Sequence, residues 1–163
     1  MKKPERPMRK SIVAVGAVAI VVIMTLVLTT GIIQLTPPTG STSYALAVKV
    51  SKSSCVRSVG FLLILADLSG FNDSIAHGAP LNPWPVVHVH TDDYVHFLVC
   101  NDDASQAHGF AIETYFDRGV AILPGEAFTI EFQATIPGSF VIYCNIFCTV
   151  HAFMVGRLIV SNS

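Results

Sequence analysis

The chain has 163 residues, of which 52% are hydrophobic and only 13% charged. This length allows one domain plus an additional segment, and the hydrophobic share is high for a soluble protein. The net charge of −1 hides two unequal parts: residues 1–10 carry five bases and one acid, whereas residues 45–163 carry five bases and ten acids, a net of −5 with histidine neutral. An acidic domain argues against a nucleic-acid partner and suits a basic protein partner.

The first predicted element is a membrane anchor. Residues 11–33 contain no charge, and as a helix these 23 residues would span roughly 34 Å, enough to cross a bilayer core. The bases before them predict that residues 1–10 are a cytoplasmic tail and that everything after residue 33 lies outside the cell membrane. The alternative is a cleaved signal peptide, but the cleavage-like Ala45-Leu46-Ala47 lies far beyond a run that is already long for a signal.

Residues 34–43 are rich in Pro, Gly, Ser and Thr and are predicted to be a linker, and residues 44–163 are predicted to be one extracytoplasmic all-β domain. The strand at 127–134 shows the pattern most clearly, because Phe128, Ile130 and Phe132 alternate with polar residues. A sandwich of two sheets with loops gathered at its ends follows. The predicted strands are 44–50, 60–67, 85–91, 94–100, 109–114, 127–134, 139–143 and 155–160.

Several residues of the domain leave alternatives open. Cys55 and Cys100 could form a disulfide or could each be buried as a free thiol. Trp84, the only tryptophan, ends a long loop and could be a docking or electron-entry contact, although packing on the sandwich edge is favoured. Three other histidines could form a second metal patch or could be ordinary strand residues, and the second alternative is favoured. They are His88, His90 and His96.

The most informative stretch is 144–154, where Cys144, Cys148, His151 and Met154 fall within eleven residues. Thiolate, imidazole and thioether groups are ligands that copper favours, and one loop could direct all four at one point. The alternative is a disulfide between the two cysteines. His108, at the start of a predicted strand, could reach the same end of the sandwich and complete the set.

The stretch from His108 to Val160 resembles the dinuclear copper (CuA) domain of cytochrome c oxidase subunit II, in particular the short, single-helix subunits of bacteria and archaea. The single N-terminal helix and the predicted strand pair before residue 101 add weaker agreement. The matching motifs stand in the order His108-Gly-Phe, Leu123-Pro-Gly-Glu, Pro137-Gly-Ser-Phe, Tyr143-Cys-Asn-Ile-Phe-Cys and His151-Ala-Phe-Met.

The resemblance implies a cupredoxin-like Greek-key β-sandwich and a role for each residue of the motif. Cys144 and Cys148 would bridge two copper ions. His108 and His151 would each bind one ion, and Met154 and the carbonyl of Ile146 would be weak ligands.

It also implies a function: a non-catalytic, electron-transfer subunit of a heme-copper terminal oxidase. Such a subunit takes electrons from cytochrome c or a small copper protein, which the acidic domain predicts to be basic, and passes them to heme in the catalytic subunit.

One departure from the family pattern bears on the number of copper ions. Only Thr149 and Val150 separate Cys148 from His151, one residue fewer than in the family, and Thr149 replaces the usual glycine. The alternative is therefore a mononuclear site of one cysteine and the two histidines, with or without Met154, and with it a membrane-tethered blue or red copper carrier. Asp103, Asn101 or Thr149 are candidates for orienting the histidines.

Overall fold

Ten strands and two short 3₁₀ helices account for the regular structure of the part that the computed structural model describes, residues 45–55 and 62–163. The predicted tail, anchor and linker lie outside these residues. Across the two described ranges, no helix has the length and hydropathy needed to span a bilayer.

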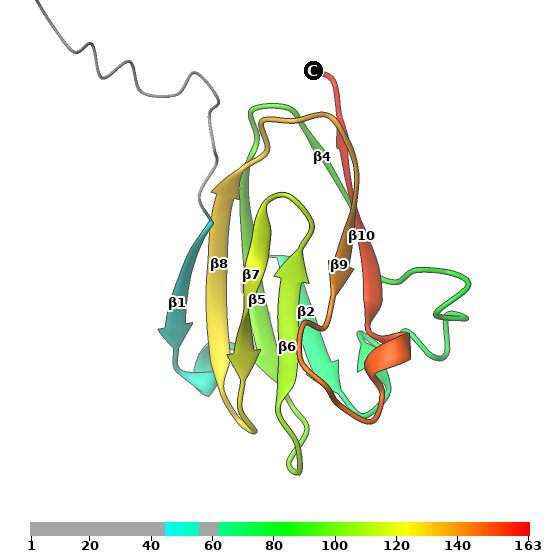
Figure 1. Cartoon of the computed structure of the whole chain (residues 1–163). Coiled ribbons are helices and arrows are strands. Elements are labelled where there is room, and N and C mark those ends of the chain that lie inside the picture. Colours follow the sequence, from blue (N-terminus) through cyan, green and yellow to red (C-terminus); the bar gives the residue numbers. More distant parts are fainter. Residues whose placement is uncertain (1–44, 56–61) are drawn as a thin grey trace, which may run out of the picture. The chain divides into compact units, whose positions relative to one another are not determined.

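The strands form two five-stranded sheets (Figure 1). Most neighbours are antiparallel, but β2 pairs with β5 and β4 pairs with β10 in parallel. The first sheet has the order β1 (Leu46–Val50), β8 (Ala127–Gln133), β5 (Tyr94–Asn101), β2 (Leu62–Asp67) and β3 (Gly70–Phe71). The second has the order β4 (Val86–His90), β10 (Val155–Ser161), β9 (Gly138–Tyr143), β6 (His108–Ile112) and β7 (Phe116–Ile122).

The core fills the space between the sheets because each strand turns alternate apolar side chains inward. Phe97 of the first sheet lies against Phe110 of the second, with ring centroids 5.6 Å apart, and both are fully buried. Ile130 and Phe132 are buried in the same cluster and Phe128 packs against it, so the alternation predicted for 127–134 is confirmed.

All eight predicted strands are present, each within about two residues of its predicted bounds, and the all-β, two-sheet architecture is confirmed. Two strands were missed. β3 has only two residues, and β7 is an edge strand in which Arg118 and Gly119 interrupt the apolar positions. Gly119, with a φ of +59°, lies within β7 and further obscures a strand pattern.

The open alternatives are settled as follows. Cys55 and Cys100 form a disulfide, which ties the helix η1 (Lys52–Cys55) to β5. Trp84 is half-buried: its ring stacks on His77 at 4.0 Å, and its indole N–H donates to the carbonyl of Asn72 at 2.9 Å. Both partners belong to the same loop as Trp84, so the ring packs within the loop between β3 (Gly70–Phe71) and β4 (Val86–His90).

The three remaining histidines do not form a metal patch. His88 and His90 lie on β4 of the second sheet, whereas His96 lies on β5 of the first sheet, beside Glu131. All three are strand residues, as expected. Because β4 and β5 belong to different sheets, His96 is not on a strand next to the other two.

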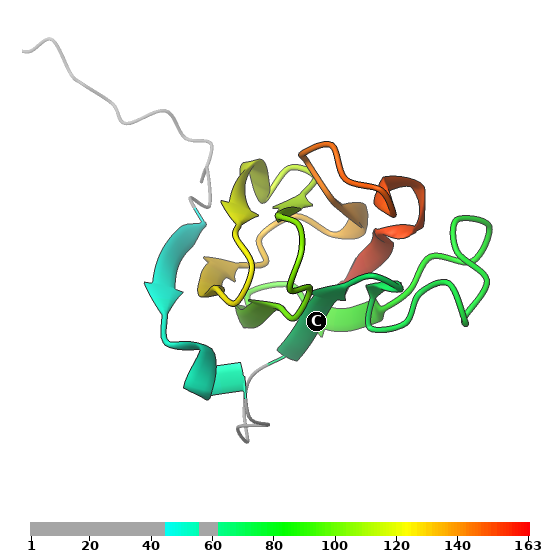
Figure 2. The ribbon, with the colours of Figure 1, turned by 90° about the horizontal axis from the view of Figure 1, so that it is seen from below.

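The strand ends place the predicted metal ligands together. β5 and β9 end, and β6 and β10 begin, at the same end of the domain, and Ser163 lies at the opposite end beside Thr91. Figure 2 views the domain from the end that carries η2 (His151–Phe153), with the β3–β4 loop next to it. Ser74 of that loop donates a hydrogen bond from its hydroxyl to the carbonyl of Phe153, and the amide of Trp84 donates to the carbonyl of Val155 at 2.8 Å.

A buried tyrosine provides a test of the fold. The Tyr115 hydroxyl donates to the carbonyl of Ile136 at 2.7 Å and accepts from its amide at 2.9 Å. Tyr115→Phe removes both bonds, so we expect the free energy of unfolding to fall by about 1.5 kcal/mol. Denaturant unfolding of the full-length chain, followed by Trp84 fluorescence, measures this. The control Tyr94→Phe removes an exposed hydroxyl and should change little; equal losses in both variants would contradict the assignment.

Candidate metal centre

The loop between β9 and β10 lies closely against the start of β6. A Cβ atom on Gly109 would come within 2.2 Å of the Asn145 side-chain oxygen and 2.6 Å of the Asn145 amide nitrogen. No larger residue fits there without moving the loop. The close approach lets the Gly109 amide donate a hydrogen bond to the Cys144 sulfur at 3.1 Å. On the other side, the Asn145 side-chain amide donates to the carbonyl of Arg118 in β7 at 3.0 Å.

Three sulfur atoms meet inside this loop. The Sγ atoms of Cys144 and Cys148 are 3.7 Å apart and are not bonded, so the disulfide alternative is wrong in this structure. The Cys148 Sγ lies 3.6 Å from the Sδ of Met154. All three side chains are buried, Met154 completely, so water has little access to the sulfurs.

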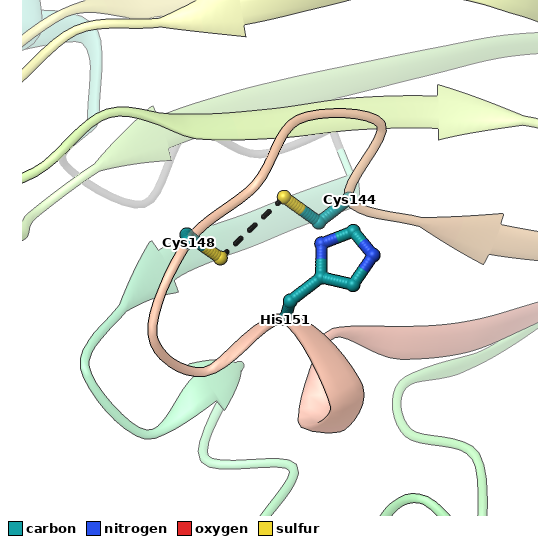
Figure 3. Close-up of side chains that lie close together, drawn as sticks. All are labelled: Cys144, Cys148 and His151. Atoms are coloured by element: carbon teal, nitrogen blue, oxygen red, sulfur yellow. Dashed lines mark hydrogen bonds between the residues drawn. The ribbon is translucent and has the colours of Figure 1, made fainter.

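His151 completes a group of potential ligands with the two cysteines (Figure 3). The ligand atoms of Cys144, Cys148 and His151 all lie within 4.8 Å of one another, and His151 is the exposed member. The carbonyl of Ile146 is shared between them: it lies 2.8 Å from His151 Nδ1 and 3.1 Å from Cys144 Sγ. This is the only group of its kind among the described residues.

A tight turn accounts for the short spacing between Cys148 and His151. The amide of His151 donates to the carbonyl of Cys148 at 3.3 Å, which closes a four-residue turn with Thr149 and Val150 as its central residues. Val150 has φ −104° and ψ 15°, close to the third residue of a type I turn. Two intervening residues are therefore enough to return the chain to the site.

His108 approaches the site from β6 and is fully buried. Its Nε2 lies 2.9 Å from a carboxylate oxygen of Asp103, and its Nδ1 has no hydrogen-bond partner in the part of the chain that the structure describes. In metal-binding histidines, one ring nitrogen typically bonds a carboxylate and the other is left free for the metal. His108 stands outside the three-residue group, but its neighbour Gly109 contacts Cys144 directly.

Asp103 is itself held by its surroundings. Burial alone would raise the pKa of its carboxyl group, but hydrogen bonds from the Ser105 hydroxyl and amide, from His108 and from the Gln106 amide outweigh this and hold that pKa well below its usual range. Asp103 is thus ionised at neutral pH and can accept a hydrogen bond from the Nε2–H group of His108. This leaves the Nδ1 of His108 as a lone-pair donor.

Burial also affects the thiol of Cys148. It raises the pKa of Cys148 to about 11, with the neighbouring Cys144 as the next cause. The thiol is therefore protonated at neutral pH, and a bound cation has to displace that proton.

The structure brings together Cys144, Cys148, His151, Met154 and the Ile146 carbonyl, with His108 beside them. Of the three candidate orienting residues, Asp103 contacts His108, while Asn101 accepts from the Asp103 amide at 2.9 Å. Sequence reasoning missed the supporting roles of Gln106 and Asn145. No local signal marks them, because their partners Thr149 and Arg118 lie 43 and 27 positions away.

No protein-family model matches the sequence, and no curated protein matches it. Solved structures do resemble the fold. A chain in a cryo-EM structure of a heme-copper terminal oxidase dimer shares 16% identity, with 93% of this chain and 98% of that chain covered and a TM-score of 0.48. Amicyanin from Paracoccus versutus shares 14% identity over 72% of this chain and 97% of its own, with a TM-score of 0.44.

A copper-containing nitrite reductase from Thermus scotoductus shares 23% identity over 63% of this chain and 28% of its own, with a TM-score of 0.49. Because all three TM-scores lie below 0.5, the function of this chain has to be argued from its own residues.

The depressed pKa of Asp103 predicts how acid affects stability. The contribution of Asp103 to the free energy of unfolding is fully present above the pKa that its carboxyl group has in the unfolded chain, near 4. It is lost as the pH falls towards the lower pKa of the folded chain. We expect Asp103→Asn in the metal-free chain to lower the free energy of unfolding by about 3 kcal/mol at pH 7, with the difference from wild type shrinking below pH ~4. Denaturant unfolding at several pH values measures both effects.

The matched control is Asp102→Asn, since Asp102 is exposed and pairs with Lys52 at the surface. Such a pair contributes at most about 1 kcal/mol, so this variant should remain close to wild type. A pH-independent difference between Asp103→Asn and wild type would refute the assignment.

Proposed function

We propose that the chain is a copper-binding electron-transfer protein, with Cys144, Cys148 and His151 at the centre of the site. The observation that carries this is the pair of unbonded sulfurs 3.7 Å apart. At a metal–sulfur bond of about 2.3 Å and a tetrahedral angle, two thiolates on one ion lie roughly 3.8 Å apart. The two cysteines are therefore already spaced to share an ion.

The chemistry of the donors favours copper. Two thiols, a thioether and imidazole groups form a soft, sulfur-rich set, and no carboxylate joins the described group of ligands. Met154 Sδ and the Ile146 carbonyl lie beside the thiols, where each could be a weak additional ligand. When bound here, copper supplies one-electron redox chemistry. The residues hold the donor atoms in place and exclude water from the sulfurs.

His108 is a further candidate ligand. Its buried Nδ1 lacks a partner among the described residues, yet its imidazole is not within the group formed by Cys144, Cys148 and His151. A single ion held by those three residues alone would leave the nitrogen unsatisfied, which is costly in a buried position. A second ion shared by the two thiolates and bound by His108 would remove that cost, and so would one ion held by one cysteine, His108 and His151. The mononuclear carrier remains the second candidate because the turn from Cys148 to His151 is short.

We place this centre in the extracytoplasmic domain of a single-pass membrane protein, with residues 11–33 as the anchor in the cell membrane. Its partner would be the catalytic subunit of a heme-copper terminal oxidase, to whose heme it passes electrons. The net charge of −5 for residues 45–163 suits a basic donor, either cytochrome c or a small copper protein. These assignments rest on the anchor pattern and on the resemblance of the motifs.

The decisive measurement is copper per chain on the full-length protein, with an EPR spectrum of the same sample. We expect two coppers that share one unpaired electron. One copper with a single-nucleus hyperfine pattern would support the mononuclear carrier. Failure to bind copper, with both thiols still free, would overturn the proposed function.

Two variants separate the roles of the sulfur ligands. Cys144→Ser removes one bridging thiolate, so the shared-electron spectrum should disappear. Met154→Leu keeps the buried volume and removes only a weak ligand, so it should change the reduction potential while copper per chain stays constant. Copper loss in Met154→Leu, or an unchanged spectrum in Cys144→Ser, would contradict these roles.

A further inference from the structure

Gln106 joins the two loops that carry the predicted ligands. Its side-chain amide donates to the Thr149 hydroxyl at 2.7 Å, and its side-chain oxygen accepts from the Thr149 amide at 3.1 Å. Gln106 lies in the β5–β6 loop, whereas Thr149 lies in the turn between Cys148 and His151. Two bonds from one planar group fix both the distance and the orientation of the residues they join.

The backbone of Gln106 belongs to the network that holds His108. Its amide donates to a carboxylate oxygen of Asp103 at 3.3 Å, and the other oxygen of that carboxylate binds His108 Nε2 at 2.9 Å. Its carbonyl accepts from the side-chain amide of Asn101 at 2.9 Å. Gln106 is thus fixed at its amide, its carbonyl and its side chain.

On the other loop, Thr149 is the first central residue of the turn. The turn uses the carbonyl of Cys148 and the amide of His151, so the amide of Thr149 has no partner within it. Gln106 supplies that partner. We call the two bonds between Gln106 and Thr149 the clamp. The clamp holds the residue that directly follows the predicted ligand Cys148. That residue lies in a turn with only two central residues, which leaves little room to absorb a displacement.

We propose that Gln106 is a positioning residue that sets the placement of the Cys148–His151 turn relative to His108. The proposal rests on the proposed copper-binding function. Through Asp103 on one side and Thr149 on the other, Gln106 links the two predicted histidine ligands without touching either. It follows that the geometry of the centre depends on a residue that does not bind metal.

The test compares four variants of the full-length chain. Gln106→Ala removes both bonds, whereas Gln106→Glu retains two acceptors for the Thr149 amide and hydroxyl and is the rescue variant. Thr149→Val removes only the hydroxyl bond. Gln133→Ala is the matched control, since Gln133 bonds the Asp92 carbonyl at the opposite end of the domain.

In the copper-loaded protein, we expect Gln106→Ala to change the EPR hyperfine pattern and to accelerate copper loss to a chelator by roughly ten- to thirtyfold, the factor for two ordinary hydrogen bonds. Thr149→Val should show a smaller acceleration, and Gln106→Glu should restore the wild-type spectrum. A wild-type spectrum and loss rate in Gln106→Ala, or an equal effect of Gln133→Ala, would overturn the proposal.

A second readout needs no copper. In the metal-free chain, the buried thiols should react with a thiol reagent about tenfold faster in Gln106→Ala than in wild type, because the clamped turn covers them. If wild type binds no copper but this difference appears, the proposed function fails while the clamp stands. If wild type binds copper and neither thiol rate nor spectrum differs, the clamp fails alone.

Discussion

The buried carboxylate of Asp103 is the group on which the arrangement of the site depends. One oxygen binds His108, and the other accepts hydrogen bonds from the Ser105 hydroxyl and amide and from the Gln106 amide. A buried charge is tolerated only when its hydrogen bonds are satisfied, so the whole β5–β6 loop has to fold around it. That loop in turn presents Gln106 to the ligand loop. The position of the thiols is thereby tied to the orientation of His108.

The elements predicted correctly are those with local signals. The strand from Ala127 to Gln133 alternates apolar and polar side chains from Phe128 onward, and the ligand loop combines rare residue types at short spacing. β7 escaped prediction because Arg118 and Gly119 interrupt the alternation of its apolar residues. The Cys55–Cys100 disulfide and the Gln106–Thr149 clamp join residues more than 40 positions apart, and no pattern along the chain encodes such pairs.

The ligand loop, residues 144–154, is hydrogen-bonded to three other segments of the chain. Asn145 is bonded to β7, Thr149 is bonded to the β5–β6 loop, and Phe153 is bonded to the β3–β4 loop. A loop anchored in this way has few alternative conformations, so its donor atoms would keep nearly the same positions in the oxidised and reduced states of the proposed copper centre. Small rearrangement on electron transfer is what a carrier requires, whereas a metal-delivery protein needs ligands that open easily.

Two buried polar atoms without hydrogen-bond partners among the described residues lie at the ligand loop: His108 Nδ1 and the Asn145 side-chain oxygen. A third, the Thr135 hydroxyl, lies between β8 and β9, away from the site. Folded proteins keep such atoms mainly where a ligand or a functional constraint compensates for them. For Asn145, the constraint is the close contact with Gly109. For His108, no contact with the described residues compensates, and Asp103 orients the ring so that Nδ1 can donate its lone pair. The unsatisfied nitrogen therefore supports, independently of any resemblance, the proposal that His108 binds a metal.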